Sequence, residues 1–242
     1  MKRFVLGVTV TALLCGFSAP VATKDRAYYE KRGEIIWEVP GENKRIALTF
    51  DDGPYPKTTE PILDLLKEYH AKATFFVVGN RVESFPETIK REIAEGHEVA
   101  NHTFNHYFLQ KKNYTTVQNE IMKTEQALEK VTGKKPLLFR PPGGFYNDQM
   151  LAIAKKNGYT TVLWSWHQDT NDWRSPGVQK IVNKVLNNAR NGDIILLHDY
   201  VPRSVQTVEA LKIILPELQR RGYEMVTVSD LINNRDSVLN PY

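Results

Sequence analysis

The chain has 242 residues, 41% of them hydrophobic and 25% charged, which excludes a mostly disordered chain, a collagen-like repeat and a multi-span membrane protein. Its only cysteine, Cys15, excludes an intrachain disulfide framework and a cysteine-rich zinc module. The formal net charge of +4 is spread along the chain without a block of Lys and Arg, so we expect no nucleic-acid partner.

The N-terminus has the layout of an export signal. The basic pair Lys2-Arg3 precedes an uncharged, largely apolar stretch at 4–22. This stretch is also long enough to remain as a membrane anchor, so residues 1–22 are either a signal peptide or an N-terminal anchor. We expect an exported protein that is extracellular, bound to the cell wall or anchored in the membrane through residues 4–22.

After a polar connector at 23–44, apolar runs typical of strands alternate with segments of helical periodicity. Helical stripes lie at 62–69, 117–131 and 178–186, and Ser175-Pro176 is predicted to cap the third. Parallel strands need helical crossovers, so the pattern predicts an α/β fold over 45–232, either an open doubly wound sheet or a barrel, before a polar tail at 233–242. The predicted strands are 45–50, 73–78, 98–102, 137–140, 159–165, 193–198 and 224–228.

Ionisable residues follow the carboxyl ends of these predicted strands. In a parallel α/β barrel such positions share one rim, where enzymes of this architecture build their active sites. No phosphate-binding glycine loop follows the first strand, which argues against a nucleotide-binding fold. The residues in question are Asp51, Asp52, His102, His106, Arg140, Asp169, Asp172 and His198.

Some of these residues have the donor types and spacing of a metal site. Two adjacent carboxylates that leave a strand point in different directions, so one can bind a cation while the other faces substrate. His102 and His106 are spaced i and i+4, which on one face of a helical turn lets both hold one metal ion. Thr103 stands where a metalloprotease HExxH motif has glutamate, which disfavours that chemistry. One carboxylate and two imidazoles leave coordination positions open, as a catalytic zinc requires.

Five motifs, in order, resemble those of the NodB-type polysaccharide deacetylases, carbohydrate esterase family 4. The resemblance covers about 45–232 and implies a distorted (β/α) barrel of about seven parallel strands. It also implies metal-dependent removal of acetyl groups from N-acetylated sugars, most similarly to bacterial peptidoglycan N-acetylglucosamine deacetylases. We therefore expect a monomer that acts on peptidoglycan glycan strands or chitin oligomers. The motifs are TFDDG (49–53), HTFNH (102–106), RPPGG (140–144), DTNDW (169–173) and LLHD (196–199).

Matched position by position, the resemblance implies a divalent metal site at Asp52, His102 and His106. Zinc is the expected ion, and cobalt or a similar ion can substitute. Asp51 would be the general base that takes a proton from a water on the metal. Arg140 would orient Asp51, for which a bidentate guanidinium is suited.

The same resemblance implies roles on the other side of the substrate. His198 would be the general acid that protonates the departing sugar amine, and Asp172 would raise its pKa. Gly143 would offer a backbone N–H to the oxyanion. Leu196 and Trp173 would form an apolar pocket for the acetyl methyl group.

Two positions bear on the substrate. Family members often carry a bulky residue, commonly tyrosine, where this chain has Gly143, so we expect altered sugar preference more than lost activity. Relatives that act on muramic acid can carry asparagine at the second position of the aspartate pair, so Asp52 favours N-acetylglucosamine. Two alternatives stay open, an O-deacetylase of the acetylxylan type and a non-catalytic sugar-binding module.

The remaining histidines and aromatic residues have more ordinary predicted roles. His70 is predicted to lie on the surface, His97 to make a structural hydrogen bond and His167 to pack or line the substrate edge. Asp169 is predicted to be structural. Phe145 and Tyr146 are candidates for stacking on sugar rings, whereas Trp164 and Trp166 are predicted mainly as core residues.

Overall fold

The structure is a computed structural model that describes residues 24–234. The predicted signal or anchor at 1–22 lies outside the described residues, as does the tail beyond residue 234. Within 24–234, none of the helices has the length and apolarity that crossing a membrane requires.

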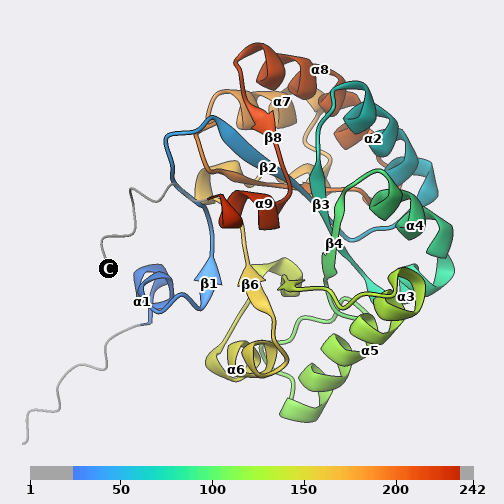
Figure 1. The fold of residues 1–242 in the computed structure, drawn as a ribbon, viewed down its shortest axis with the longest axis vertical. Coiled ribbons are helices and arrows are strands. Elements are labelled where there is room, and N and C mark those ends of the chain that lie inside the picture. The colour runs from blue at the N-terminus through green and yellow to red at the C-terminus, as the bar shows by residue number, and fades with distance from the viewer. Residues whose placement is uncertain (1–23, 235–242) are drawn as a thin grey trace, which may run out of the picture.

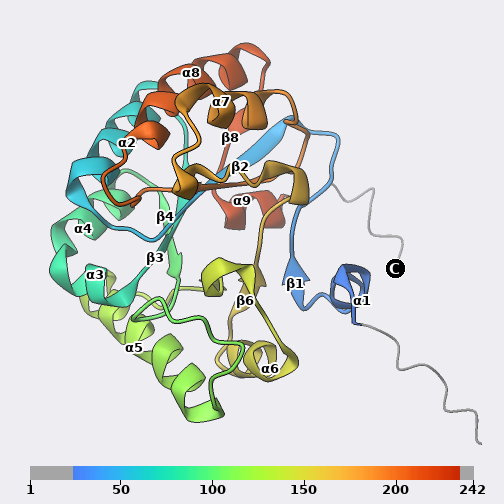
Figure 2. The ribbon, with the colours of Figure 1, turned by 180° about the vertical axis from the view of Figure 1, so that it is seen from behind.

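The core of the molecule is a parallel sheet with its helices on the outside (Figures 1 and 2). Neighbouring strands are hydrogen-bonded in the order β1-β6-β5-β4-β3-β2-β7, and β8 pairs with β2. Every pair is parallel, and all seven predicted strands are present, which confirms the predicted (β/α) barrel. The strands are β1 (Ile35–Ile36), β2 (Arg45–Asp51), β3 (Ala73–Val77), β4 (Glu98–Asn101), β5 (Leu138–Phe139), β6 (Thr160–Val162), β7 (Ile194–His198) and β8 (Glu224–Met225).

From β2 onwards at least one α-helix follows every strand, as the periodicity predicted. Pro216 lies inside α8 without ending it. The α-helices are α1 (Arg26–Lys31), α2 (Pro56–Glu68), α3 (Gly79–Ser84), α4 (Pro86–Ala94), α5 (Tyr114–Thr132), α6 (Asp148–Lys156), α7 (Val178–Leu186), α8 (Gln206–Arg220) and α9 (Val228–Asn233). Short 3-10 turns are η1 (Pro142–Gly144), η2 (Trp166–Gln168) and η3 (Asp172–Arg174).

Within the described residues, an isolated bridge, and not a strand pairing, joins the two ends of the strand order. Asp193, just before β7, bridges Glu38, just after β1, in an antiparallel sense. The chain after β6 also reaches β7, because Ser165 N–H donates to Ile194 C=O at 3.0 Å. The two ends of the strand order therefore lie beside each other.

Two local predictions differ from the structure. The expected polar connector at 23–44 contains α1 and β1, and its Tyr29, Ile35 and Trp37 are buried. A strand of two residues is too short to show a hydrophobic period, so β1 could not be predicted from the sequence. The predicted cap of α7 at Ser175 is wrong, because the helix begins after Gly177, whose N–H donates to the Gln206 side chain.

The pleat of the strands separates two cores. On β2, Leu48 and Phe50 pack outward against the helices, while Ala47 faces the barrel interior. Thr49 and Asp51 share the face of Ala47, so polar groups enter the interior towards the carboxyl end of the strand. An apolar strand can thus deliver a carboxylate to a central site.

Helix α9 covers the opposite end of the barrel. Its Val228 and Leu231 join the interior core, and Val228 N–H donates to Thr74 Oγ1 at 2.9 Å. Ser229 N–H donates to Glu98, the first residue of β4, at 3.2 Å. Because these contacts lie at the amino ends of the strands, the carboxyl ends are left for the site.

Candidate active site

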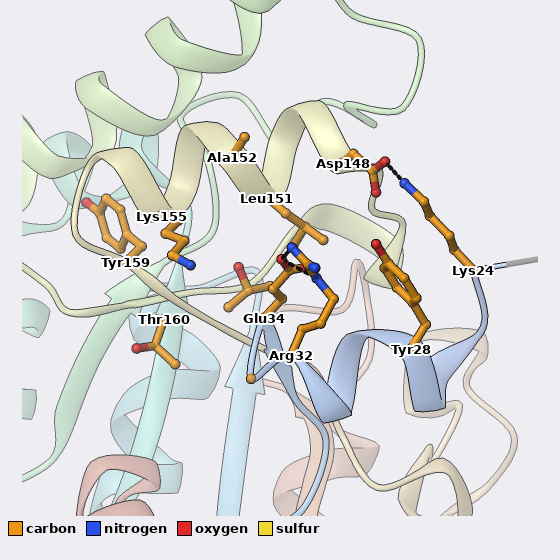
Figure 3. Close-up of a pocket in the computed structure, with 12 residues that line it drawn as sticks. Lys24, Tyr28, Arg32, Glu34, Asp148, Leu151, Ala152, Lys155, Tyr159 and Thr160 are labelled. Carbon is orange, nitrogen blue, oxygen red and sulfur yellow. Dashed lines mark hydrogen bonds and ion pairs between the residues drawn. The ribbon is translucent and has the colours of Figure 1, made fainter.

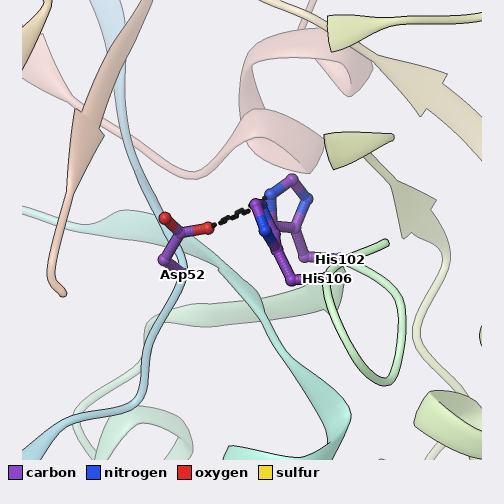
Figure 4. A group of neighbouring side chains, drawn as sticks. All are labelled: Asp52, His102 and His106. Atoms are coloured by element: carbon purple, nitrogen blue, oxygen red, sulfur yellow. Dashed lines mark ion pairs between the residues drawn. The ribbon is translucent and has the colours of Figure 1, made fainter. Parts of the chain in front are cut away.

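Asp52, His102 and His106 converge at the carboxyl ends of β2 and β4 (Figure 4). The Oδ1 atom of Asp52 lies 3.0 Å from His106 Nε2 and 3.5 Å from His102 Nε2. Burial favours a higher pKa for Asp52, but the two neighbouring imidazoles outweigh it and hold that pKa well below its usual range. The predicted ligand set is therefore assembled in space.

The segment that carries both histidines is a loop, so the predicted helical turn is wrong. Thr103 and His106 adopt positive φ angles of 68° and 56°, which an α-helical turn does not contain. This conformation, and not helical spacing, brings His106 within 5.1 Å of His102, measured between ring centroids.

Buried polar side chains that the sequence reasoning missed hold this loop. Glu120 of α5 accepts hydrogen bonds from the backbone N–H groups of Phe104 at 3.1 Å and Asn105 at 2.8 Å. Asn101 accepts one from the Thr103 N–H at 2.9 Å. A sequence signal for Glu120 exists, since this charged residue stands beside Ile121 on the helix face that also carries Val117 and Leu128.

The tautomer of His102 follows from its second ring nitrogen. Nδ1 lies 2.7 Å from the backbone carbonyl of Arg140. A carbonyl oxygen only accepts, so Nδ1 carries a hydrogen, and Nε2 is the ring nitrogen that faces Asp52 and would be available to a cation. This is the arrangement that a metal-binding histidine requires.

The same three residues pass a test of fit for a divalent cation. Asp52 Oδ1 is buried and has no aligned hydrogen-bond donor, although two imidazole nitrogens lie within 3.5 Å of it. One carboxylate and two imidazoles are donors that zinc prefers. The ligand side chains of Asp52 and His106 are 24% and 35% exposed, so solvent reaches the site.

Asp51 lies next to this site and is held by Arg140. The guanidinium is fully buried and its Nη1 donates to Asp51 Oδ1 at 2.6 Å. The predicted bidentate pairing is wrong, because the other donors reach Thr49 Oγ1 and the carbonyls of Val162 and Leu163. Arg140 is thus locked by the barrel wall and leaves Asp51 Oδ2 free, 3.7 Å from His102 Nε2.

His198 is the register partner of Asp51 on the adjacent strand β7, so both side chains emerge on the same face. Its Nδ1 lies 2.7 Å from Asp172 Oδ1, and Asp172 Oδ2 accepts from the His198 backbone N–H and from Thr207 Oγ1. Burial favours a lower pKa for His198, but the charge and hydrogen bond of Asp172 outweigh it and raise the pKa to about 9. An imidazolium is therefore stable here at neutral pH.

The three predicted substrate-side residues occupy the same end of the barrel. Gly143 lies in η1 with a φ of 66°, and its backbone is exposed. Leu196 is buried on β7, and Trp173, on the adjoining η3, is 49% exposed with Arg174 stacked on its ring. Their predicted roles stay predictions.

A side chain at residue 143 would meet two aromatic rings. A Cβ atom there would lie 2.9 Å from Phe108 and 3.0 Å from Phe145. Both rings are about half exposed, and they contact each other edge to face at 5.9 Å between centroids. The ring of Phe108 is 6.1 Å from that of His106, so this aromatic pair borders the candidate metal site.

The other predicted residues divide between surface and core. His70 is exposed, and His97 Nδ1 accepts a hydrogen bond from the Ala73 N–H at 3.3 Å, so both predictions are confirmed. Asp169 has a structural role, because its carboxylate accepts from the Asn171 N–H. Tyr146, a stacking candidate, packs edge to face on Tyr29.

The two tryptophans also separate. Trp166 is 69% exposed, against the prediction of a core residue, whereas Trp164 is half-buried and packs on the interior core. The difference has a local cause, since Trp166 opens a 3-10 turn at the rim and Trp164 precedes it in the barrel wall.

A second cluster of possible ligands in the described residues comprises Glu38, His167 and Asp193. Asp193 Oδ1 lies 2.9 Å from His167 Nε2, and its Oδ2 accepts from Gln168. Glu38 is paired with Arg26 at 2.9 Å. These pairs join the ends of the strand order, and they agree with the prediction that His167 packs.

A pocket of about 570 Å³ lies between α1 and α6, away from the candidate metal site (Figure 3). Its charges are largely paired, because Lys24 contacts Asp148 and Arg32 contacts Glu34. None of the predicted site residues lines it.

Comparison with known proteins agrees with this geometry. Residues 38–162 match the family model described as polysaccharide deacetylase. A peptidoglycan-N-acetylglucosamine deacetylase of Bacillus cereus is 51% identical over 86% of this chain and 97% of its own length. The peptidoglycan-N-acetylmuramic acid deacetylase PdaC of Bacillus subtilis is 40% identical over 80% of this chain, which spans 40% of that longer protein.

A comparison with solved structures also finds a peptidoglycan deacetylase. The crystal structure of a peptidoglycan N-acetylglucosamine deacetylase in complex with 4-naphthalen-1-yl-N-oxidanyl-benzamide superposes with a TM-score of 0.79 at 36% identity. The superposition covers 84% of this chain and 94% of that one. The chain belongs to the polysaccharide deacetylase family and is a hydrolase of the N-deacetylase type.

Proposed function

We propose that the chain is a metal-dependent N-deacetylase that releases acetate from N-acetylglucosamine residues of cell-wall polysaccharide. The observation that carries the proposal is the convergence of Asp52, His102 and His106 beside a restrained carboxylate, Asp51, and a histidine that favours its protonated form, His198. A non-catalytic sugar-binding module has no need of this set of groups.

The metal would be held by Asp52, His102 and His106, and the donor set favours zinc. A cation there supplies Lewis-acid polarisation of the acetamide carbonyl and lowers the pKa of water. His102 is prepared for this role by its Nδ1–H bond to the Arg140 carbonyl, which fixes its ring orientation.

Asp51 would act as the general base. Arg140 occupies one carboxylate oxygen and leaves Oδ2 to accept a proton from the attacking water. The oxygen of that water forms a bond to the acetamide carbon. A backbone N–H of Gly143, at an exposed turn, would stabilise the resulting oxyanion.

His198 would complete the reaction as the general acid. Its Nδ1 is held by Asp172, so Nε2 is the nitrogen that gives a proton to the sugar nitrogen as the C–N bond breaks. Acetate and a free amine are the products. Leu196 and Trp173 would contact the acetyl methyl group.

The substrate assignment rests on the relatives and on the aromatic pair Phe108 and Phe145. The relatives named above act on peptidoglycan, and aromatic rings beside a metal site can stack on the apolar faces of sugar rings.

Residues 1–22 would direct export to the cell wall, either as a cleaved signal peptide or as a membrane anchor. Fractionation of expressing cells, with the protein detected by an antibody, tests this location.

The substrate proposal is tested by acetate release from purified peptidoglycan, chitin oligomers and acetylated xylan. We expect release from the first two, loss of activity on chelation and recovery with added Zn²⁺. Release from acetylated xylan alone would instead establish the O-deacetylase alternative. Activity that persists through exhaustive chelation would contradict the metal dependence.

A pH profile tests the pairing of Asp172 with His198. The acid must be protonated, so wild-type kcat/KM is expected to fall as pH rises through about 9, the raised pKa of His198. Asp172→Asn removes the charge that raises this pKa, and the alkaline limb should move down towards the ordinary histidine value of about 6.5. Asp169→Asn, a carboxylate of the same motif outside this pair, should keep the wild-type limb. An unmoved limb in Asp172→Asn would remove His198 from the acid role.

A further inference from the structure

The backbone at Asp52 is held in an unusual conformation. Its φ of 78° lies in the left-handed region, which residues other than glycine, asparagine and aspartate rarely adopt. Such a conformation persists where the surrounding structure holds it. Two hydrogen bonds flank it, from the Asp199 N–H to the Asp51 carbonyl at 3.2 Å and from the Val78 N–H to the Gly53 carbonyl at 2.9 Å.

The side chain of Asp199 also occupies the space beside Gly53. A Cβ atom at residue 53 would lie 1.9 Å from Asp199 Oδ2 and 2.4 Å from its Cγ. The φ of Gly53 itself is not in the left-handed region, so the backbone would accept alanine there. Glycine is therefore required at residue 53 by the carboxyl group of Asp199.

Asp199 is in turn fixed by the start of α2. Its side chain is 1% exposed, and Thr59 Oγ1 donates to its Oδ2 at 2.6 Å. The hydroxyl of Thr58 donates to its backbone carbonyl. Burial raises the pKa of Asp199 to about 7 against the hydrogen bond of Thr59, so a neutral isostere should replace it well.

We propose that Asp199 is a positioning residue for the metal site, whose carboxyl group packs against Gly53 and thereby holds the Asp52 side chain towards His102 and His106. The inference rests on the proposed function, in which Asp52 binds the metal. Because Asp199 follows His198 directly, it also joins the strand of the proposed acid to the loop of the metal ligand. Thus Asp199, at the end of the LLHD motif, acts through packing on Gly53, at the end of the TFDDG motif.

A double-mutant cycle on the full chain tests this role. Zn²⁺ affinity is measured by competition with a chromophoric chelator for the wild type, Gly53→Ala, Asp199→Ala and the double variant. Each single variant is expected to bind Zn²⁺ at least about 10-fold more weakly. In Gly53→Ala the new methyl group collides with the Asp199 carboxyl, and in Asp199→Ala the carboxyl that supports the loop is lost. In the double variant the methyl group enters the space that the carboxyl leaves, so its loss should be at least about 10-fold smaller than the product of the single losses.

Two further variants separate positioning from general stability. Asp199→Asn keeps the shape beside Gly53 and should stay within about 3-fold of wild-type affinity. Glu98→Gln is the control, since Glu98 lies at the amino end of β4, opposite the site, where the Thr74 hydroxyl donates to it at 2.7 Å and the Ser229 N–H at 3.2 Å. It should alter the melting temperature without altering Zn²⁺ affinity. The absorption spectrum of bound Co²⁺ reports whether the ligand geometry changes.

The outcomes are distinct. A wild type that binds no metal would contradict the proposed function and this inference with it. If the wild type binds Zn²⁺ and the loss of affinity in the double variant equals the product of the two single losses, the positioning role alone is overturned. A loss of affinity above about 10-fold in Asp199→Asn would overturn it as well. If one of the single alanine variants fails to fold, the other carries the test beside Asp199→Asn. It should still lose at least about 10-fold in Zn²⁺ affinity, and wild-type affinity there would overturn the packing role.

Discussion

Asp51→Asn is expected to lower kcat/KM by about 10²–10⁴-fold while the protein keeps its bound metal. The amide cannot accept a proton from water at neutral pH, yet its oxygen can still accept the Arg140 hydrogen bond. Asp52, which is the predicted ligand, is untouched. Acetate release under saturating Zn²⁺, together with elemental analysis of the purified variant, measures both parts.

The control for this variant concerns the buried charge of Arg140. Removing the charge of Asp51 leaves the guanidinium without a counter-ion, and an orphaned buried charge costs about 3–5 kcal/mol. We expect a smaller loss, because Arg140 keeps its bonds to Thr49, Val162 and Leu163 and its stacking on Phe76. Circular dichroism and a melting curve verify the fold. Turnover like that of the wild type would remove Asp51 from the role of base.

Replacing a predicted metal ligand should have a different signature. Asp52→Ala or His106→Ala is expected to lose metal and activity together, because each removes one of three donors that lie within 4.8 Å of one another. The loss of affinity should exceed the about 10–100-fold that an outer-shell partner typically costs. Elemental analysis and chelator competition measure it.

The matched control is His70→Ala, which removes an exposed histidine that lies outside the site. It should leave metal content and activity as in the wild type. Full metal content in Asp52→Ala would show that this carboxylate is not a ligand. In that case Asp51 is the carboxylate to examine next, since its Oδ2 lies 3.7 Å from His102 Nε2.

The strands and the participants in the site were within reach of sequence reasoning. Buried parallel strands such as Ala73–Val77 form continuous apolar runs, and polar residues that end such runs share one rim of a barrel. Asp51 and His198 were identified in this way. The short strand β1 was not, because two residues carry no period.

The amino-acid order alone reveals which residue types stand at the ends of which strands, and hence the parallel α/β class and the chemistry available at the rim. How these groups meet depends on contacts that form only in the folded barrel. The loop turns at Thr103 and His106, the clamp of Glu120 and the packing of Asp199 on Gly53 join segments far apart in the chain. Hydrophobic periodicity indicates which face of a segment is buried, but not which other segment covers that face. The covering segment depends on how the whole chain folds into the barrel.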